Sequence, residues 1–291
     1  MKTLRFISAG LFAVLLSFTF AACGGDDEED GTNDGPGNEQ PETGITKRLK
    51  QYSYTETSGE DAGYSYVMTF KYDEAGKIER IEKYTSDNDE SWSEAYDYYW
   101  DGNTIEEYND DYHKMTYRIG AIDNLVSSAK YHDYYYNDNN AKISFTYNTS
   151  GQLTSYTEVI YDETDKYSFK WNGDKVVELR EEESEYPEYN STIKFTYGNK
   201  KCSGYYPNAG EFVDFSPITL VHPELFGCKI NNLPTKANYF YDIYGEVGVN
   251  NFTHEFDQDG YVIKLKGNGW MYHEDDLEKH ELNYEYNYVW E

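Results

Sequence analysis

Residues 66–81 have the sequence YVMTFKYDEAGKIERI, and this stretch decides the fold. Tyr66, Met68 and Phe70 fall on every second position, which places them on one face of a β-strand. Residues 73–76 (DEAG) then supply a turn in which Gly76 can adopt a positive φ. An apolar residue, Ile78, begins the returning segment. The stretch therefore predicts an antiparallel β-hairpin.

The same unit recurs along the chain: a strand that ends in an aromatic residue, a turn rich in Gly, Asn or Asp, and an apolar residue soon after it. The closing aromatics are at positions 72, 100, 147, 171, 197 and 256. Neighbouring gaps are 28, 24 and 26 residues, enough for one hairpin and its return connection. We therefore expect about twelve to fourteen antiparallel strands.

Composition favours a particular kind of all-β fold. Hydrophobic residues make up 38% of the chain, but 33 of its 291 residues are tyrosine. A buried tyrosine needs a partner for its hydroxyl, so a dry, close-packed sandwich core is disfavoured. We expect an all-β domain over residues 45–291, a large antiparallel meander forming a curved sheet or open barrel with a partly wet interior.

One segment, 204–233, interrupts this pattern because it is poor in tyrosine and contains several prolines. Ser216 before Pro217 is typical of a helix N-cap, and Gly227 can end a second short helix. We expect a short helical or irregular insert that covers a sheet edge or plugs a barrel mouth.

Cys202 and Cys228 lie on either side of most of this insert. In an oxidising compartment they can pair, and the loop closed would stabilise the fold by about 3–4 kcal/mol. The alternative is two separate thiols, and the sequence leaves both open.

Charge excludes several classes of partner. The chain has 54 acidic and 25 basic residues, a net charge of −29. Such a surface repels phosphate backbones and anionic lipid, so we expect no nucleic-acid partner. No run of 20 apolar residues is present, so we expect no transmembrane helix.

Residues 1–22 have the features of a signal peptide. Lys2 and Arg5 precede an apolar run from Phe6 to Phe20, and the small residues Ala21 and Ala22 follow it. The next residue is Cys23, and the sequence FAAC resembles the bacterial lipobox. The resemblance implies cleavage before Cys23, acylation of its thiol and amine, and a membrane partner through the lipid. An ordinary signal peptide with a chance cysteine at the cut site is the alternative.

Residues 23–44 contain eight acidic and no basic residues, together with several glycines. Like charges and glycine favour an extended, disordered tether. The cluster from Asp26 to Asp30 resembles the surface-export signal of Bacteroidota lipoproteins. We therefore expect an outer-membrane lipoprotein displayed on the extracellular face, with the inner leaflet as the alternative.

Taken together, these features of the sequence resemble those of a known protein family. A lipobox, an acidic tether, repeated hairpins, the insert sequence HPELFG at 222–227 and Leu233-Pro234 are similar to Bacteroidota lipoproteins of unknown function with a porin-like β fold. The resemblance covers nearly all of the region after the tether and implies that fold.

No catalytic or metal-binding pattern stands out. The six histidines lack metal-ligand spacing, and Asp257-Gln258-Asp259-Gly260 is a fragment of a calcium loop that falls in a repeated hairpin turn, which favours a turn. No pair among the 54 carboxylates is distinguished as a glycosidase pair. We expect a non-enzymatic protein without cofactors or metals.

Exposed aromatic residues are the better functional candidates, because flat rings stack on sugars while nearby amides and carboxylates bond their hydroxyls. The candidates are Trp92, Trp100, Trp171 and Trp270, each with tyrosine neighbours. The competing interpretation is that these rings only pack the sheet. We expect a binding module for a glycan or an envelope protein, with a structural envelope component or, more distantly, a carbohydrate-active hydrolase as alternatives.

Overall fold

The computed structural model describes residues 47–58, 62–87, 90–109, 113–121, 123–133, 141–160, 163–213, 216–272 and 278–291. Cys23, the signal peptide and the tether lie outside these residues. Within them, no helix is long and apolar enough to cross a membrane.

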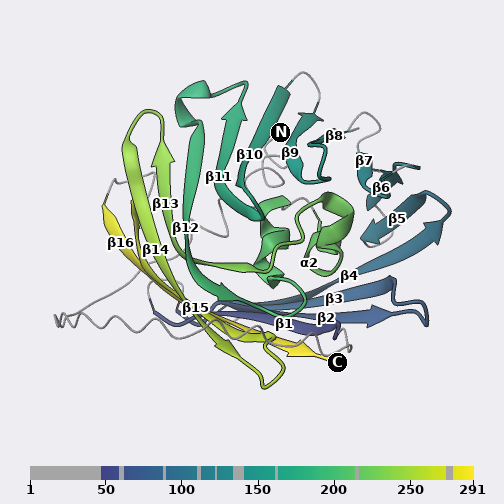
Figure 1. Ribbon diagram of the computed structural model, residues 1–291, viewed down its shortest axis with the longest axis horizontal. Helices are drawn as coiled ribbons and strands as arrows, with labels where there is room; N and C mark the ends of the chain where they lie inside the picture. The colour runs from purple at the N-terminus through teal and green to yellow at the C-terminus, as the bar shows by residue number, and fades with distance from the viewer. Residues whose placement is uncertain are drawn as a thin grey trace.

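The described residues form one closed antiparallel β-barrel of sixteen strands. Each strand pairs with its neighbour in sequence, and β1 pairs with β16 to close the ring (Figure 1). The strands are β1 Leu49–Glu56, β2 Ser65–Tyr72, β3 Ile78–Asp87, β4 Glu90–Asp101, β5 Thr104–Asn109, β6 His113–Ile119, β7 Val126–Asp133, β8 Lys142–Tyr147, β9 Leu153–Ile160, β10 Glu163–Asn172, β11 Lys175–Glu183, β12 Ser191–Lys201, β13 Asn232–Tyr241, β14 Gly245–Phe256, β15 Val262–Tyr272 and β16 Lys279–Trp290.

The predicted all-β meander is confirmed, and two details are corrected. The expected twelve to fourteen strands are too few, because strands as short as six residues, such as β5 and β8, fit between the longer ones. The sheet is also closed rather than open, because β1 finds a partner in β16, with Tyr54 opposite Tyr286. Closure leaves no free edge among these sixteen strands.

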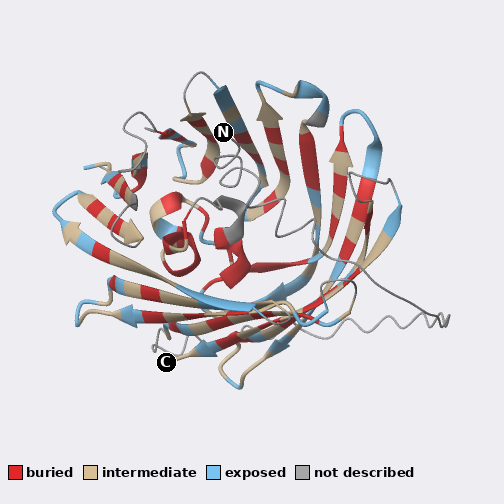
Figure 2. Cartoon of the chain, turned by 180° about the vertical axis from the view of Figure 1, so that it is seen from behind, coloured by how far each residue is buried: buried red, intermediate tan, exposed pale blue. Residues whose placement is uncertain are grey.

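Buried and less buried residues alternate along the strands (Figure 2), as a period of two requires. Much of the interior beside β1, β2 and β16 is tyrosine. Tyr54 contacts the rings of Tyr66 and Tyr286, with centroids 5.3 and 5.0 Å away. Such ring pairs each add about 0.5–1.5 kcal/mol beyond their area.

Five of the six closing aromatics, together with Trp290, have a shared structural role. In six strand pairs, a tyrosine hydroxyl or tryptophan N–H near the end of one strand donates to a backbone carbonyl at the start of the strand before it. The donors and acceptors are Tyr72 to Leu49 (2.7 Å), Trp100 to Ile78 (2.9 Å), Tyr147 to Val126 (2.6 Å), Trp171 to Leu153 (2.6 Å), Tyr197 to Val176 (2.7 Å) and Trp290 to Val262 (2.7 Å). All six acceptor residues are fully buried. We call these bonds the aromatic latches; Phe256, the remaining closing aromatic, has no donor.

The insert is confirmed and lies inside the ring of strands (Figure 1). It contacts the end of the barrel at which β9 begins, since the Leu153 N–H donates to the Gly227 carbonyl, and we call this end the insert end. It comprises the 3₁₀ turns η2 Pro207–Val213 and η3 Pro223–Phe226 around the short helix α2 Ile218–Val221. Phe226 is fully buried between Tyr117 and Phe145. A further 3₁₀ turn, η1 Pro187–Tyr189, precedes β12.

Both predicted insert signals have structural counterparts. Gly227 ends η3 with a φ of 63°, as expected of a left-handed C-cap. The N-cap position of α2 belongs to Pro217 rather than Ser216, but Ser216 Oγ still accepts the Ile218 N–H at 3.4 Å. The helix therefore begins one residue later than the sequence indicates.

Candidate functional site

The four candidate tryptophans are not brought together, since they lie on β4, β10 and β15, which are not neighbours in the barrel. Trp100 and Trp171 each use their indole N–H in an aromatic latch. Trp100 also packs edge-on against His222 of the insert, with ring centroids 5.5 Å apart. Both tryptophans join one strand to another, and Trp100 also joins the barrel wall to the insert.

Trp92 lies on the same face of β4 as the buried Tyr98, and 43% of its surface is exposed. Its neighbour on that face, Glu94, lies 3.5 Å from Lys83 on β3. The Lys83 ammonium is also 5.4 Å from the centre of the Tyr66 ring. Trp92 therefore adjoins an ion pair on the inner wall, at the end of the barrel opposite the insert.

Trp270 has a different setting, on the outer face of β15. Leu265 and Met271, at odd positions of this strand, are buried, whereas Trp270 and Tyr272 lie on the opposite face. Their ring centroids are 5.3 Å apart at 71°, and Lys279 Nζ lies 4.7 Å from the Trp270 ring. An aromatic pair with an adjacent ammonium thus lies on the outer face, with both rings partly buried and Tyr272 also packed against the core.

A row of three asparagines lies beside this pair. Asn251, Asn268 and Asn283 are register partners on β14, β15 and β16, one strand spacing apart. All three alternate with buried residues, so they share the outer face with Trp270. Asn251 Nδ2 donates to the Asn268 carbonyl at 3.4 Å, and Asn283 Nδ2 donates to Ser58 Oγ at 3.1 Å. We call Trp270, Tyr272 and these three residues the aromatic–amide surface.

Sequence reasoning found only Trp270 of this surface. Tyr272 follows it by two positions, a spacing that places both on one face of a strand and was available in the sequence. The asparagines come from three strands, and only the register places them in a row.

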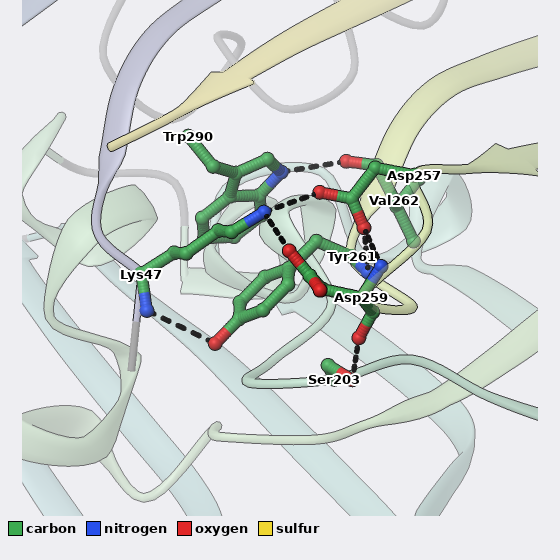
Figure 3. Close-up of polar contacts among 7 residues, drawn as sticks. All are labelled: Lys47, Ser203, Asp257, Asp259, Tyr261, Val262 and Trp290. Carbon is green, nitrogen blue, oxygen red and sulfur yellow. Dashed lines mark hydrogen bonds and ion pairs between the residues drawn. The ribbon is translucent and has the colours of Figure 1, made fainter. Parts of the chain in front are cut away.

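The calcium-loop fragment is a turn, as predicted. Asp257 Oδ1 accepts the backbone N–H groups of Asp259 and Tyr261, each at 2.9 Å. The Lys47 ammonium lies 2.7 Å from Asp257 and 2.6 Å from Asp259 (Figure 3). Burial alone would raise the pKa of Asp257, but the bonds from Lys47 and from the two backbone N–H groups outweigh it and hold the pKa below its usual value. Among the described residues, no group of three or more His, Cys, Asp or Glu side chains is arranged to hold a metal ion.

Carboxyl groups also lie on the inner wall. Glu158 on β9 and Glu181 on β11 are 4% exposed, and Tyr167 on the strand between them pairs with Glu181. Burial raises the pKa of each carboxyl to about 7; nearby Asp165 adds to the effect at Glu158, and a hydrogen bond with Tyr167 opposes it at Glu181. These two groups change charge near neutral pH.

A third carboxyl, Glu107, joins the wall to the insert. It accepts hydrogen bonds from Ser216 of the insert and, at 2.8 Å, from Tyr117 on β6. Burial raises the pKa of Glu107, and these hydrogen bonds offset only part of the effect.

Cys202 and Cys228 are both buried, and in the structure they are two separate free thiols rather than a disulfide. Cys202 Sγ lies 3.5 Å from the Asn231 carbonyl. Burial raises the pKa of Cys202 to about 12, which leaves little reactive thiolate at neutral pH.

Comparisons with known proteins identify the fold. No family model matches the chain, and no curated protein matches it. A porin-like protein from Bacteroides uniformis has a similar structure, with 16% sequence identity and a TM-score of 0.59. The similarity covers 84% of this chain and 96% of that protein. A second porin-like protein, from Bacteroides vulgatus, is similar over 84% of this chain and 99% of its own, at 11% identity and a TM-score of 0.55. The predicted porin-like β fold is therefore confirmed.

Proposed function

We propose that this protein is an outer-membrane lipoprotein, displayed on the cell surface, whose barrel stands in water and binds a glycan without catalysis. The observation that carries the binding role is the aromatic–amide surface, in which Trp270 and Tyr272 lie beside three asparagines in register.

Ion pairs on the outer wall support a barrel in water. Arg80 lies 2.6 Å from Asp97 across β3 and β4, and Arg180 lies 2.7 Å from Asp242. Lys264 and Glu285 form a similar pair across β15 and β16, at 2.5 Å. A membrane-spanning barrel presents an apolar band about 25 Å tall on this face.

The lipid anchor rests on Cys23 and its lipobox. Replacement of Cys23 by Ser should release the protein from the membrane or leave it unprocessed, and should abolish labelling by a fatty-acid analogue. Continued membrane retention without acyl label would contradict the anchor. Neutral residues in place of the acids from Asp26 to Asp30 should reduce protease access on intact cells.

The chemistry of the surface favours an uncharged, hydroxyl-rich ligand. Indole and phenol rings offer flat apolar faces, and amides both donate and accept hydrogen bonds. Asn268 and Asn251 are exposed and need no desolvation of a charge on binding. A net charge of −29 disfavours anionic polysaccharides.

Native affinity electrophoresis of residues 45–291 through gels containing neutral and anionic polysaccharides tests the binding role. A neutral glycan should retard the barrel, and Trp270→Ala and Asn268→Ala should each abolish most of the retardation. Trp92→Ala, on the inner wall, is the matched control and should migrate like the parent. Retardation by no glycan, or equal loss in the control, would contradict glycan binding at this surface and direct the search to a protein partner.

Hydrolysis is the second candidate function, favoured by the buried pair Glu158 and Glu181, since a raised carboxyl pKa suits a general acid. Release of reducing sugar, lost in Glu158→Gln, would establish it.

A further inference from the structure

Three carboxyls form a row across the inner wall, near the end of the barrel opposite the insert end. Asp165 on β10 is the register partner of Glu158 on β9 and of Glu183 on β11. Glu158 lies two positions from the buried Tyr156, so the row faces the interior. The spacing of the row is set by the strands, which are about 4.8 Å apart. We call Glu158, Asp165 and Glu183 the carboxyl row.

Two tyrosines and a further carboxyl lie next to this row, on the side toward the insert. Tyr156, Tyr167 and Glu181 are register partners on the same three strands. The two tyrosine rings are stacked, with centroids 4.4 Å apart and planes at 14°. Glu181 accepts a hydrogen bond from Ser191 at 3.2 Å and is 4% exposed. This part of the inner wall therefore combines carboxyl groups with aromatic rings.

Positive charge is missing from this part of the wall. Among the described residues, no cationic side chain pairs with Glu158, Asp165 or Glu181. Lys166, next to Asp165 in sequence, lies on the outer face and pairs with Glu182 at 3.7 Å. Burial raises the pKa of Glu158 and of Glu181, and neighbouring carboxyls raise both further. The wall therefore carries uncompensated negative charge whenever these groups ionise.

Glu158 lacks a hydrogen-bond donor as well as a positive partner. The residue is 4% exposed, and among the described residues no group donates a hydrogen bond to its carboxyl. Its register partner on one side is Ile143, whose side chain has no polar atom, and on the other side it is Asp165. A buried carboxylate without a donor is costly, so a ligand that brings N–H groups would stabilise the ionised form of Glu158.

We propose that the carboxyl row binds a linear polyamine, an alkyl chain whose protonated amines are three or four methylene groups apart. Protonated amines donate N–H bonds to carboxylates and supply the positive charge that the wall lacks. Amines separated by three methylene groups are about 5 Å apart in an extended chain, close to the strand spacing that separates the carboxyls. Tyr156 and Tyr167 add aromatic rings beside the row, and such rings attract ammonium groups.

Other cations fit these residues less well. Among the described residues, no group of three or more His, Cys, Asp or Glu side chains is arranged to hold a metal ion. A quaternary ammonium brings no N–H donor to Glu158. Asp165 and Glu183 are half-buried, so the row retains contact with solvent. The aromatic–amide surface lies on the outer face of other strands, so this inference does not depend on glycan binding.

Isothermal titration calorimetry of the full chain with spermidine tests the site. The titration is made at physiological ionic strength, which screens attraction to the acidic outer surface. Glu158→Gln should weaken binding by about tenfold or more, because the amine loses a charged acceptor. This variant should fold, since glutamine stays neutral at a buried position. Glu178→Gln is the matched control: Glu178 lies on the outer face of β11, opposite Lys194, and its loss should leave the affinity unchanged.

Proton release gives a second readout. Glu158 and Glu181 have a pKa of about 7, so both are partly protonated at neutral pH and must ionise to hold an amine. Titrations at pH 7 in two buffers of different protonation enthalpy should therefore show that spermidine binding releases protons. The number released should fall in Glu158→Gln and stay the same in Glu178→Gln.

Each outcome supports or overturns the site. No binding of spermidine by the parent chain would overturn it. An equal loss of affinity in Glu158→Gln and Glu178→Gln would show only non-specific attraction to an acidic protein, and would overturn it as well. Ethylammonium, which has one amine, should bind about tenfold or more weakly than spermidine, and equal affinity would refute recognition by a row of carboxyls. Glycan retardation should be the same in Glu158→Gln and the parent, so failure of one proposal leaves the other standing.

Discussion

The Trp100 indole N–H donates a 2.9 Å hydrogen bond to the carbonyl of Ile78, the first residue of the neighbouring strand. Ile78 is fully buried, so its carbonyl has little access to water as an alternative partner. The same arrangement recurs in five other strand pairs, always at the insert end. The repeated aromatic is therefore a part of the barrel's hydrogen-bonding framework.

Replacement of Trp100 by Phe should lower the free energy of unfolding by about 1–3 kcal/mol, because the Ile78 carbonyl loses this donor. Urea denaturation measures the change. Trp92→Phe, at a site 43% exposed, is the matched control and should change stability by about 0.5 kcal/mol or less. Equal losses in the two variants would show that the latch does not stabilise the fold.

Gly227 and Gly173 allow backbone conformation to be separated from crowding. Both have a φ near 60°, so alanine should cost about 1–2 kcal/mol of strain at either site. A Cβ at Gly173 meets nothing within 4 Å, whereas at Gly227 it would collide with the Gly151 carbonyl and lie 2.9 Å from Leu153 N. Gly227→Ala should therefore lose about 1–3 kcal/mol more than Gly173→Ala. Equal losses in thermal denaturation would contradict the close packing of insert against wall.

Asn208 ties the insert to two strands at once. Its side-chain nitrogen donates to the Tyr52 hydroxyl at 3.3 Å, and its oxygen accepts from the Tyr288 hydroxyl. Asn208→Leu should lower stability by about 2 kcal/mol or more, because both hydroxyls lose a buried partner. Proteolysis within the insert should become faster. Adding Tyr52→Phe and Tyr288→Phe should restore part of the loss; no recovery would contradict this bridging role.

Glu158 and Glu181 should make stability depend on pH near neutrality. Their folded pKa of about 7 exceeds the unfolded value of 4.5, so the folded protein binds more protons between these limits. Their contribution is fully present below about pH 4.5 and is lost as the pH rises through 7, by up to about 3 kcal/mol for each group. The variant with both Glu158→Gln and Glu181→Gln should show a flatter profile of urea midpoint against pH. An unchanged profile would contradict the burial of these carboxyls.

The hairpin sequences by themselves determined the all-β fold, because alternation and turn chemistry act within about ten residues of chain. Residues 66–81 contain every signal of β2, its turn and β3, and the structure forms them as predicted. The insert could also be predicted from the sequence, because its signals are local: proline favours the start of a helical turn, and Gly227 can adopt the positive φ that ends η3.

Only the tertiary structure decided what the aromatics do. Trp100 and Trp270 each have a tyrosine within two residues in sequence, yet one donates to Ile78 and packs on the insert while the other lies on the outer wall. Other contacts also join residues that are far apart in sequence. The strand pair β1 and β16, and the ion pair of Lys47 with Asp257, join residues more than two hundred positions apart. The three asparagines of the row are separated by at least fifteen positions. Strand register sets such contacts, because a shift of one residue turns every side chain to the opposite face, and register is fixed only when the whole barrel closes.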